Sequence, residues 1–269
     1  MTTARLPAVA GLFYPGDPGE LLQTVDSLLD QAAKSRATQP PSSEQAPKAI
    51  IAPHAGYIYS GPIAATAYQC VSAHRQQIKR VAIFGPSHRV AFRGLAVPSD
   101  DTFTTPLGDI PLDKTAIEQL LQLPQIQSLE QAHSQEHSLE VHLPFLQRVL
   151  DDFSLIPVVV GDASTDDVAA AINAIWNDKD TLIVISSDLS HYHDYATAQR
   201  MDRHTSTAIE GLQIEHIDYE DACGRNPVKG LLLVARQRGL IAETIDLRNS
   251  GDTAGSKDSV VGYGAYIFH

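Results

Sequence analysis

Residues 182–193 read Leu-Ile-Val-Ile-Ser-Ser-Asp-Leu-Ser-His-Tyr-His, an apolar run followed by a polar segment with two histidines. The run Leu182–Ile185 has the length and composition of a strand buried on both faces. Two other apolar runs have the same form: Ala49–Ala52 precedes Pro53-His54-Ala55-Gly56-Tyr57, and Val81–Phe84 precedes Gly85-Pro86-Ser87-His88. These segments indicate a covered sheet whose strands run into histidine-bearing loops.

Helical patterns alternate with these strands. The expected helices cover Gly19–Lys34, Gly61–Gln76, Lys114–Leu123, Glu136–Leu150 (kinked or divided by Pro144), Ser164–Asp178, Ala196–Leu212 and Pro227–Gln237. Further strands are expected at Gly94–Val97, Leu155–Val160 and Ala265–Phe268. Capping signals support two helices: Ser164 with Asp167 at one start, and Asn226 before Pro227 at the other. The alternation predicts an α/β fold of three layers, α/β/α, around a central mixed, largely parallel sheet.

The composition is that of an ordinary globular protein. The chain has 269 residues, of which 43% are hydrophobic and 19% charged, and we expect a single domain over residues 1–269 with a flexible, proline-rich surface loop at about 36–47. Its apolar runs are shorter than the ~18–20 residues that span a bilayer, and the N-terminal residues lack a signal-peptide pattern. We therefore expect a cytoplasmic protein without membrane contact.

Charge and cysteine content argue against a nucleic-acid-binding protein and against a disulfide-stabilised one. The net charge of −12 argues against a nucleic-acid partner, because phosphate backbones are bound by basic surfaces. Two cysteines in a chain of this length make a disulfide framework unexpected. Cys70 lies in an alanine-rich helical segment and is expected in the core. Cys223 precedes a helix start, where the helix and Arg225 are expected to lower its thiol pKa; a small buried hydrophobe is the alternative.

The three histidine-bearing loops predict one shared site. Ligands bind beyond the strand C-termini in α/β sheets, so parallel neighbouring strands would bring His54, His88 and His191 together. One histidine after a strand is usually a surface residue, but three in equivalent positions favour a common site. Neutral imidazole is the commonest protein ligand for divalent transition metals, and the sequence therefore predicts a metal site.

A fourth histidine cluster spans Glu136-His137-Ser138-Leu139-Glu140-Val141-His142. Its histidines are five residues apart, so they lie on different sides of a helix and do not form the zinc-protease motif. We expect Glu136 or His137 to contact a substrate or to support the metal ligands; the alternative is a solvated helix start.

Taken together, the motifs resemble one known family. The segments 53–61, 85–88, 136–145, 186–191, 223–224 and 250–252 are similar, in order and over nearly the whole chain, to those of the Memo family, whose prokaryotic branch is protein B of the AmmeMemoRadiSam system. The resemblance implies a fold similar to LigB-type class III extradiol dioxygenases, which hold non-haem Fe(II) with two histidines and a carboxylate.

The resemblance also implies roles for individual residues. His54, His88 and Cys223 would bind iron or copper, with zinc as a further candidate, and His191 would act as acid and base beside Asp188. His137, Glu136, Tyr57 and His142 would contact the substrate or support the ligands. A thiolate in place of the carboxylate favours softer or redox-active ions over the iron of ring-cleaving enzymes, which weakens the expectation of ring cleavage.

Three functional hypotheses follow. The first is a metal-dependent redox enzyme acting on a small molecule, and the second is a non-catalytic protein that binds a peptide or partner in the same cleft. The third, a hydrolase using Ser187 or Ser190 with His191 and Asp188, is disfavoured because these residues are too close in sequence for a usual triad and no Gly-x-Ser-x-Gly elbow is present.

Overall fold

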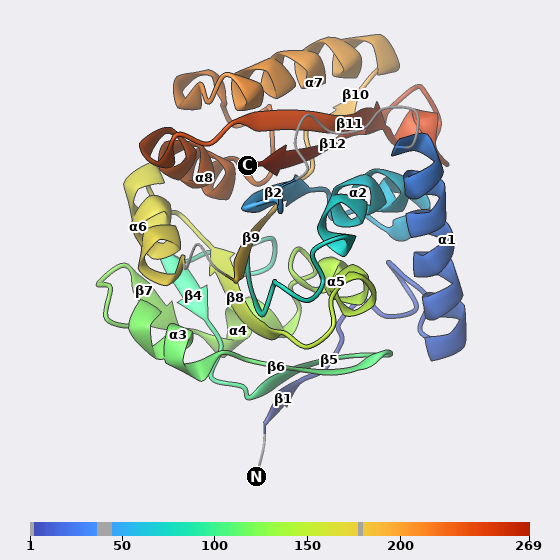
Figure 1. Ribbon diagram of the computed structural model, residues 1–269. Helices are drawn as coiled ribbons and strands as arrows, with labels where there is room; N and C mark the ends of the chain where they lie inside the picture. Colours follow the sequence, from blue (N-terminus) through green and yellow to red (C-terminus); the bar gives the residue numbers. More distant parts are fainter. Residues whose placement is uncertain (1–2, 37–44, 177–179) are drawn as a thin grey trace.

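A mixed sheet with helices on both faces dominates the computed structural model, which describes residues 3–36, 45–176 and 180–269 (Figure 1). The three-layer α/β prediction is thus confirmed. Most of the expected proline-rich loop (37–44) and the end of the expected helix at Asp178 lie outside the described residues.

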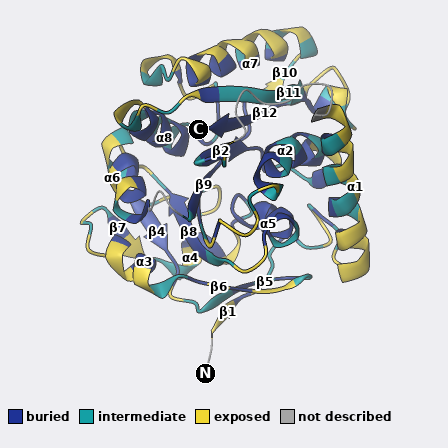
Figure 2. Ribbon diagram, in the orientation of Figure 1, coloured by how far each residue is buried: buried dark blue, intermediate teal, exposed yellow. Residues whose placement is uncertain are grey.

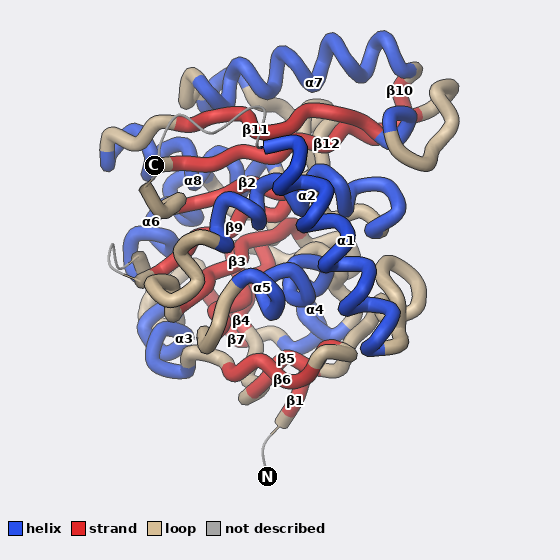
Figure 3. Tube along the Cα trace, turned by 45° about the vertical axis from the view of Figure 1, so that its right-hand side comes forward, coloured by secondary structure: helices blue, strands red, loops and turns tan. Residues whose placement is uncertain are grey.

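The strands of this sheet run in the order β10-β12-β2-β9-β3-β8-β4-β7, and β11 also pairs with β12. Figure 3 shows them lying one beside another through the molecule. Their bounds are β2 Ala49–Ala52, β3 Arg80–Pro86, β4 Leu95–Val97, β7 Ile126–Ser128, β8 Ser154–Val160, β9 Thr181–Ser186, β10 His191–His193, β11 Ala242–Asn249 and β12 Val260–Phe268.

The parallel part of the sheet is its centre. Strands β2, β9, β3 and β8 are parallel neighbours, with Ala52 opposite Ser186 and Phe84 opposite Ile185. At the flanks β12 runs antiparallel to β2, and β4 runs antiparallel to β8. The three histidine-bearing loops therefore leave the same edge of the sheet from adjacent strands.

The helices form two layers. Their bounds are α1 Pro18–Arg36, α2 Tyr57–Ser72, α3 Lys114–Leu120, α4 Glu130–Ser134, α5 Leu143–Val149, α6 Thr165–Ile175, α7 Tyr195–Glu210 and α8 Arg225–Arg238, with short 3-10 turns η1 Glu140–His142, η2 Ile214–His216 and η3 Ser250–Asp252. Helices α1, α2 and α5 pack together on one side, α3, α6 and α8 on the other, and α7 packs on β11 and β12 (Figure 1).

Buried side chains fill the space between these layers. The strands β2, β8 and β9 are almost entirely buried, whereas the outer sides of the helices are exposed (Figure 2). Among the described helices, none combines the length and the apolar character needed to cross a membrane.

A second, smaller sheet was not predicted. It contains β1 Ala4–Arg5, β5 Thr102–Thr105 and β6 Gly108–Pro111, in the order β1-β5-β6. Strand β1 is too short to show a periodicity, and β6 contains Gly108 and Pro111, residues that are depleted in strands.

Two helix predictions were wrong in ways that affect the site. The expected helix Glu136–Leu150 is a loop at 136–139, followed by η1 and α5. The carboxylate of Glu136 accepts the backbone N–H groups of His137 and Ser138, which favours a turn over a helix. Helix α8 begins at Arg225 after Gly224 rather than after an Asn226 cap. The Asn226 side chain instead donates to the Gly161 carbonyl.

Candidate metal centre

A cleft of about 670 Å³ lies where the loops after β2, β3 and β9 meet. This volume is typical of sites for small molecules. The side chains of His54, His88, Asp188, His191 and Cys223 all line it. The three histidine-bearing loops are therefore brought together at one cleft. The remaining lining residues are Phe13, Ala55, Gly56, Pro86, Ser87, His137, Tyr192, Tyr219, Glu220, Arg225 and Val261.

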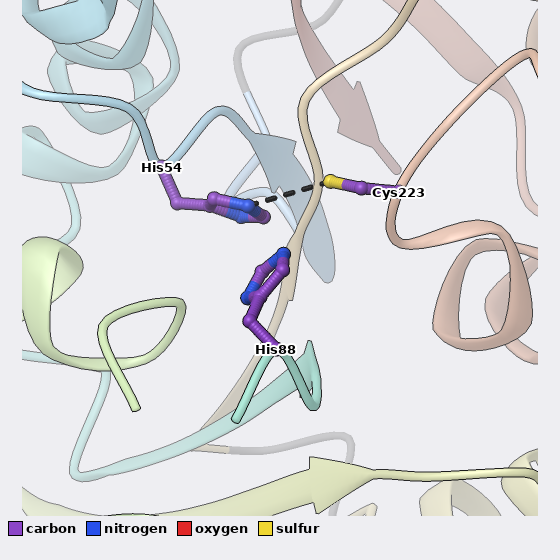
Figure 4. Close-up of side chains that lie close together, drawn as sticks. All are labelled: His54, His88 and Cys223. Carbon is purple, nitrogen blue, oxygen red and sulfur yellow. Dashed lines mark hydrogen bonds between the residues drawn. The ribbon is translucent and has the colours of Figure 1, made fainter. Parts of the chain in front are cut away.

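Three of these residues have the spacing of a metal-binding group. One potential ligand atom each from His54, His88 and Cys223 lies within 4.8 Å of the others. Figure 4 shows the three side chains converging from separate segments of the chain. The Cys223 Sγ atom is 3.3 Å from His54 Nε2. Two imidazoles and one thiol are a donor set suited to iron, copper or zinc.

The ring orientation of His54 is fixed by a buried serine. Ser186 Oγ lies 2.6 Å from His54 Nδ1 and donates its own proton to the Ser138 carbonyl, also at 2.6 Å. The Ser186 hydroxyl proton is engaged by the Ser138 carbonyl, so the Ser186 oxygen can only accept from His54. His54 Nδ1 must therefore carry a proton and donate it to Ser186. His54 Nε2 is therefore left with a lone pair facing Cys223.

Glu136 fixes the second imidazole in the same way. Its Oε1 atom accepts from His88 Nδ1 at 2.9 Å, and its Oε2 atom accepts the His88 backbone N–H at 2.6 Å. Burial would raise the pKa of this carboxyl, but the hydrogen bonds from His88 prevail and lower it to about 2. Glu136 is thus an anion that leaves His88 Nε2 free to bind an ion. Such carboxylate–histidine pairs commonly support metal ligands.

The thiol is not activated in the way that its position suggested. Burial, and then the neighbouring Asp188, raise the pKa of Cys223 well above its usual range. The prediction that the start of α8 and Arg225 would lower this pKa was wrong, because desolvation is the largest influence on the thiol and raises it. Burial lowers the pKa of His54. Without an ion, a neutral thiol therefore donates to a neutral imidazole.

Asp188 lies on the loop after β9, and His191 is the first residue of β10, which that loop leads into. Asp188 is 4% exposed, and burial raises its pKa to about 6 although it accepts the His54 backbone N–H at 2.7 Å. His191 Nδ1 donates to the Leu189 carbonyl at 2.8 Å, which leaves its Nε2 unprotonated when the ring is neutral. Both predicted proton-transfer residues therefore line the cleft with groups that can accept a proton.

Hydrogen bonds to α7 and β12 hold the loop between β9 and β10 in place. Asp202 Oδ1 accepts the Ser190 backbone N–H at 3.0 Å. The backbone of Gly262 pairs with Leu189 and Ser190, each at 2.8 Å. These contacts hold the segment between Asp188 and His191 against the sheet.

His137 contributes a further ring to the cleft. It stacks on His88 with ring centroids 4.6 Å apart, and the ring of Phe13 packs against it with a centroid distance of 4.8 Å. Burial lowers the pKa of His137 to about 4. A neutral imidazole in this position can contact a substrate without adding charge to the site.

The other two residues expected near the site lie behind it. Tyr57 is buried and donates to the Val141 carbonyl at 2.7 Å. His142 is buried with its Nδ1 atom 2.8 Å from the Tyr68 hydroxyl. Neither side chain is among those that line the cleft.

The two serines of the hydrolase hypothesis are poorly placed as nucleophiles. Ser187 and Ser190 are both 0% exposed, and the Ser187 hydroxyl donates to the Asp188 carbonyl. A nucleophile must reach a bound substrate, so this arrangement disfavours hydrolysis by either serine.

Sequence reasoning missed several residues that shape the site. Ser186 was recognised only as part of a motif, and Phe13, Tyr219 and Glu220 were not singled out. Phe13 lies far from the other site residues in the sequence, in a segment without a motif. A serine as the last residue of an otherwise apolar strand was a usable signal, because a buried hydroxyl needs a partner.

Comparison with known proteins agrees with the motifs. A family model described as "Memo-like protein" matches residues 5–267. A protein of Aquifex aeolicus (strain VF5) named "MEMO1 family protein" is 35% identical, with 98% of each chain covered. A protein of the same name from Methanobrevibacter smithii is 35% identical, covering 98% of this chain and 99% of the relative.

One solved structure agrees with the fold. An uncharacterized protein from Escherichia coli K12 matches with a TM-score of 0.53 at 12% identity, covering 81% of this chain and 99% of that one. At this identity the likeness concerns the arrangement of helices and strands alone.

Proposed function

Since this chain belongs to the Memo family, we propose that it is a metal-dependent enzyme in which His54, His88 and Cys223 hold one ion. The observation that carries the proposal is the pair of imidazoles whose Nδ1 protons are donated to Ser186 and Glu136. Both Nε2 lone pairs are thereby left available, and one nitrogen of each ring lies within 4.8 Å of the other and of the Cys223 sulfur.

The donor set narrows the choice of ion. A thiolate with two imidazoles favours iron or copper, with zinc as a further candidate. When bound, such an ion would supply Lewis acidity or redox chemistry to a small molecule in the cleft. Three protein donors are fewer than these ions usually take, which would leave room for a substrate oxygen.

Cys223 must change state when an ion binds. Its thiol proton, held at His54 Nε2 in the free protein, has to leave so that sulfur can act as a thiolate ligand. The high pKa of this half-buried thiol means that loading releases one proton near neutral pH. We therefore expect the ion affinity to rise with pH.

Asp188 and His191 would then move protons for the substrate. The pKa of Asp188, about 6, lies near the pH at which a general acid or base works well. His191 presents an unprotonated Nε2 while its Nδ1 is held by the Leu189 carbonyl. A substrate hydroxyl that entered the cleft could give its proton to His191.

A second candidate function is the binding of a peptide or partner without catalysis. It is favoured by two aromatic side chains that line the cleft and are strongly exposed, Tyr192 at 78% and Tyr219 at 72%. Tyrosines in such positions are common at recognition surfaces.

Metal analysis tests the proposal. Protein purified without oxygen is expected to contain one iron or copper ion per chain, and His54→Ala and His88→Ala should lose it while remaining folded by circular dichroism. His191→Ala should keep the ion, as should His204→Ala, which removes an exposed imidazole on α7. Full metal occupancy in both of the first two variants would overturn the ligand assignment.

A further inference from the structure

One wall of the cleft carries a guanidinium group that the proposed chemistry does not use. Arg225 is the first residue of α8 and lies two positions after Cys223. Its side chain lines the main cleft together with His54 and His88. It also lines an adjoining cleft of about 250 Å³, which shares Pro86, Ser87 and Cys223 with the first. Arg225 therefore lies where two cavities meet beside the metal-binding group.

Arg225 has no oppositely charged partner among the residues that the structure describes. No carboxylate in the described part of the chain lies within ion-pair distance of it, and its guanidinium makes no hydrogen bond to those residues. The guanidinium lies over the ring of Tyr219, whose centroid is 4.7 Å from the guanidinium carbon. A cation stacked on a ring keeps its N–H groups, which lie in the guanidinium plane, available for an anion.

The acidic groups of the cleft do not cancel this charge. Glu220 is exposed, so water and salt screen it. Asp188 is tied to the His54 backbone N–H. Four further lining residues are histidines, which add no negative charge. An anion that reached Arg225 would therefore meet a fixed, planar donor group in a partly desolvated position.

Aromatic rings form the walls around the same space. Phe13 packs on His137, Tyr219 lies under Arg225, and Tyr192 is held at a φ of 61°. A non-glycine residue in this left-handed region is uncommon and tends to occur at functional sites. Here the strained backbone holds a tyrosine that is 78% exposed at the cleft.

We propose that Arg225 is the specificity-determining residue of this cleft and binds the acid group, a carboxylate or a phosphate, of a small organic substrate. The remainder of that substrate would lie between the aromatic walls and reach the group formed by His54, His88 and Cys223. This inference rests on the proposed function for the role of that group, but the binding of an acid by Arg225 can be measured with or without metal.

A matched set of small probes tests the proposal. Phenylacetate, benzylphosphonate and the neutral phenylacetamide have the same benzyl group and differ in the group presented to Arg225. Binding to the full-length protein, metal-loaded and metal-free, is measured by ligand-observed NMR and calorimetry. At least one acid should bind about tenfold or more tightly than the amide, because hydrogen bonds to charged groups are the stronger ones. The preferred acid identifies carboxylate or phosphate as the recognised group.

Variants assign the effect to one side chain. Arg225→Gln should abolish the preference for the acid, and Arg225→Lys should retain only part of it, since lysine lacks the planar pair of donors. Arg203→Gln removes an equal charge from an exposed position on α7 and should change nothing. Equal binding of acid and amide, or an undiminished preference in Arg225→Gln, would overturn the inference.

The two proposals fail separately. Loss of acid preference in Arg225→Gln with no metal in any preparation would support this inference and contradict the proposed metal enzyme. The opposite result is also possible: a stoichiometric ion that is lost in His54→Ala, with a preference for the acid that persists in Arg225→Gln. That result would support the proposed metal enzyme and contradict this inference.

Discussion

Asp202 offers a direct test of how this fold holds a buried charge beneath its functional loop. It is 3% exposed on α7, and its Oδ1 atom accepts the Ser190 backbone N–H at 3.0 Å. Its carboxylate packs so closely on Gly262 that a Cβ atom there would lie 2.1 Å from Oδ2. The substitution Asp202→Asn keeps the shape and one acceptor oxygen but removes the ionisable group.

The size of the effect follows from the pKa. Burial raises the pKa of Asp202 from an ordinary value of 3.8 to about 6. This difference corresponds to about 3 kcal/mol of unfolding free energy at pH values above both. Asparagine adds an amide NH₂ that needs its own partner, which offsets about 1 kcal/mol or more. We expect Asp202→Asn to be about 1–2 kcal/mol more stable than the parent at pH 8.

The pH dependence has a definite sign. A carboxyl with a raised pKa in the folded state stabilises the fold below pH 3.8 and loses that contribution as the pH rises through about 6. The parent should therefore lose stability relative to Asp202→Asn between about pH 4 and 6, and the gap should stay constant above about pH 7. Urea unfolding of both metal-free proteins from pH 4 to 8, followed by circular dichroism, measures this gap.

A surface substitution provides the control. Asp30→Asn changes the charge equally on the exposed side of α1, and it should alter stability by less than about 0.5 kcal/mol at any pH. If Asp202→Asn were no more stable than the parent at pH 8, or if the gap did not change between pH 4 and 7, the buried carboxylate would not carry the cost assigned to it here.

Four other predictions concern the site and its supports. Glu136→Gln should lower the unfolding free energy by about 2–3 kcal/mol at pH 7, since the pKa of this carboxyl is lowered from 4.5 to about 2. In urea titrations this loss of stability should shrink as the pH falls from 4.5 towards 2, and a loss that stayed constant would contradict the electrostatic cause. Ser186→Ala leaves a buried imidazole N–H without its acceptor, so metal affinity, measured by competition with a chromophoric chelator, should fall about 10–100-fold; unchanged affinity would show that the hydroxyl does not orient the ring. Cys223 in the metal-free protein should react with iodoacetamide at pH 7.5 far more slowly than glutathione, because burial raises its pKa; mass spectrometry of the peptide reports the rate, and fast labelling would refute the assignment. Gly85→Ala should lower stability by about 1–3 kcal/mol, because the new Cβ would lie 2.7 Å from the Ser138 hydroxyl oxygen; thermal unfolding at or above the parent temperature would contradict it.

The sequence predicts the centre of the fold well because burial on both faces leaves a clear pattern. Strand β2 was predicted with its bounds, Ala49–Ala52, and β9 within one residue at each end. Strand β11, Ala242–Asn249, was missed since most of its residues are only half-buried and its sequence includes Glu243, Asp246 and Arg248. Pairing with β12 forms this strand, and that contact cannot be read from a local pattern.

The position of the site was predictable, but its electrostatics were not. Adjacent strands and chain order are enough to bring His54, His88 and His191 to one edge. The pKa of Cys223 depends on how deeply the thiol is buried and on its closeness to Asp188, which only the packed structure reveals. The hydrogen bond from His88 to Glu136 also depends on the packed structure, because Glu136 lies in a loop where the local sequence pattern predicts a helix.

The imidazoles of His54, His88 and His191 each have a protein acceptor for the Nδ1 proton, on Ser186, Glu136 and Leu189 respectively. Folding therefore already restricts the rotation of these rings, and they lose little further conformational entropy when an ion or a ligand binds. Small domains that fold around zinc collapse when a chelator removes it. This protein should instead stay folded when its metal ion is removed and added back repeatedly. The fraction of sites that hold an ion should then depend on the concentration of free metal and not on whether the chain is folded.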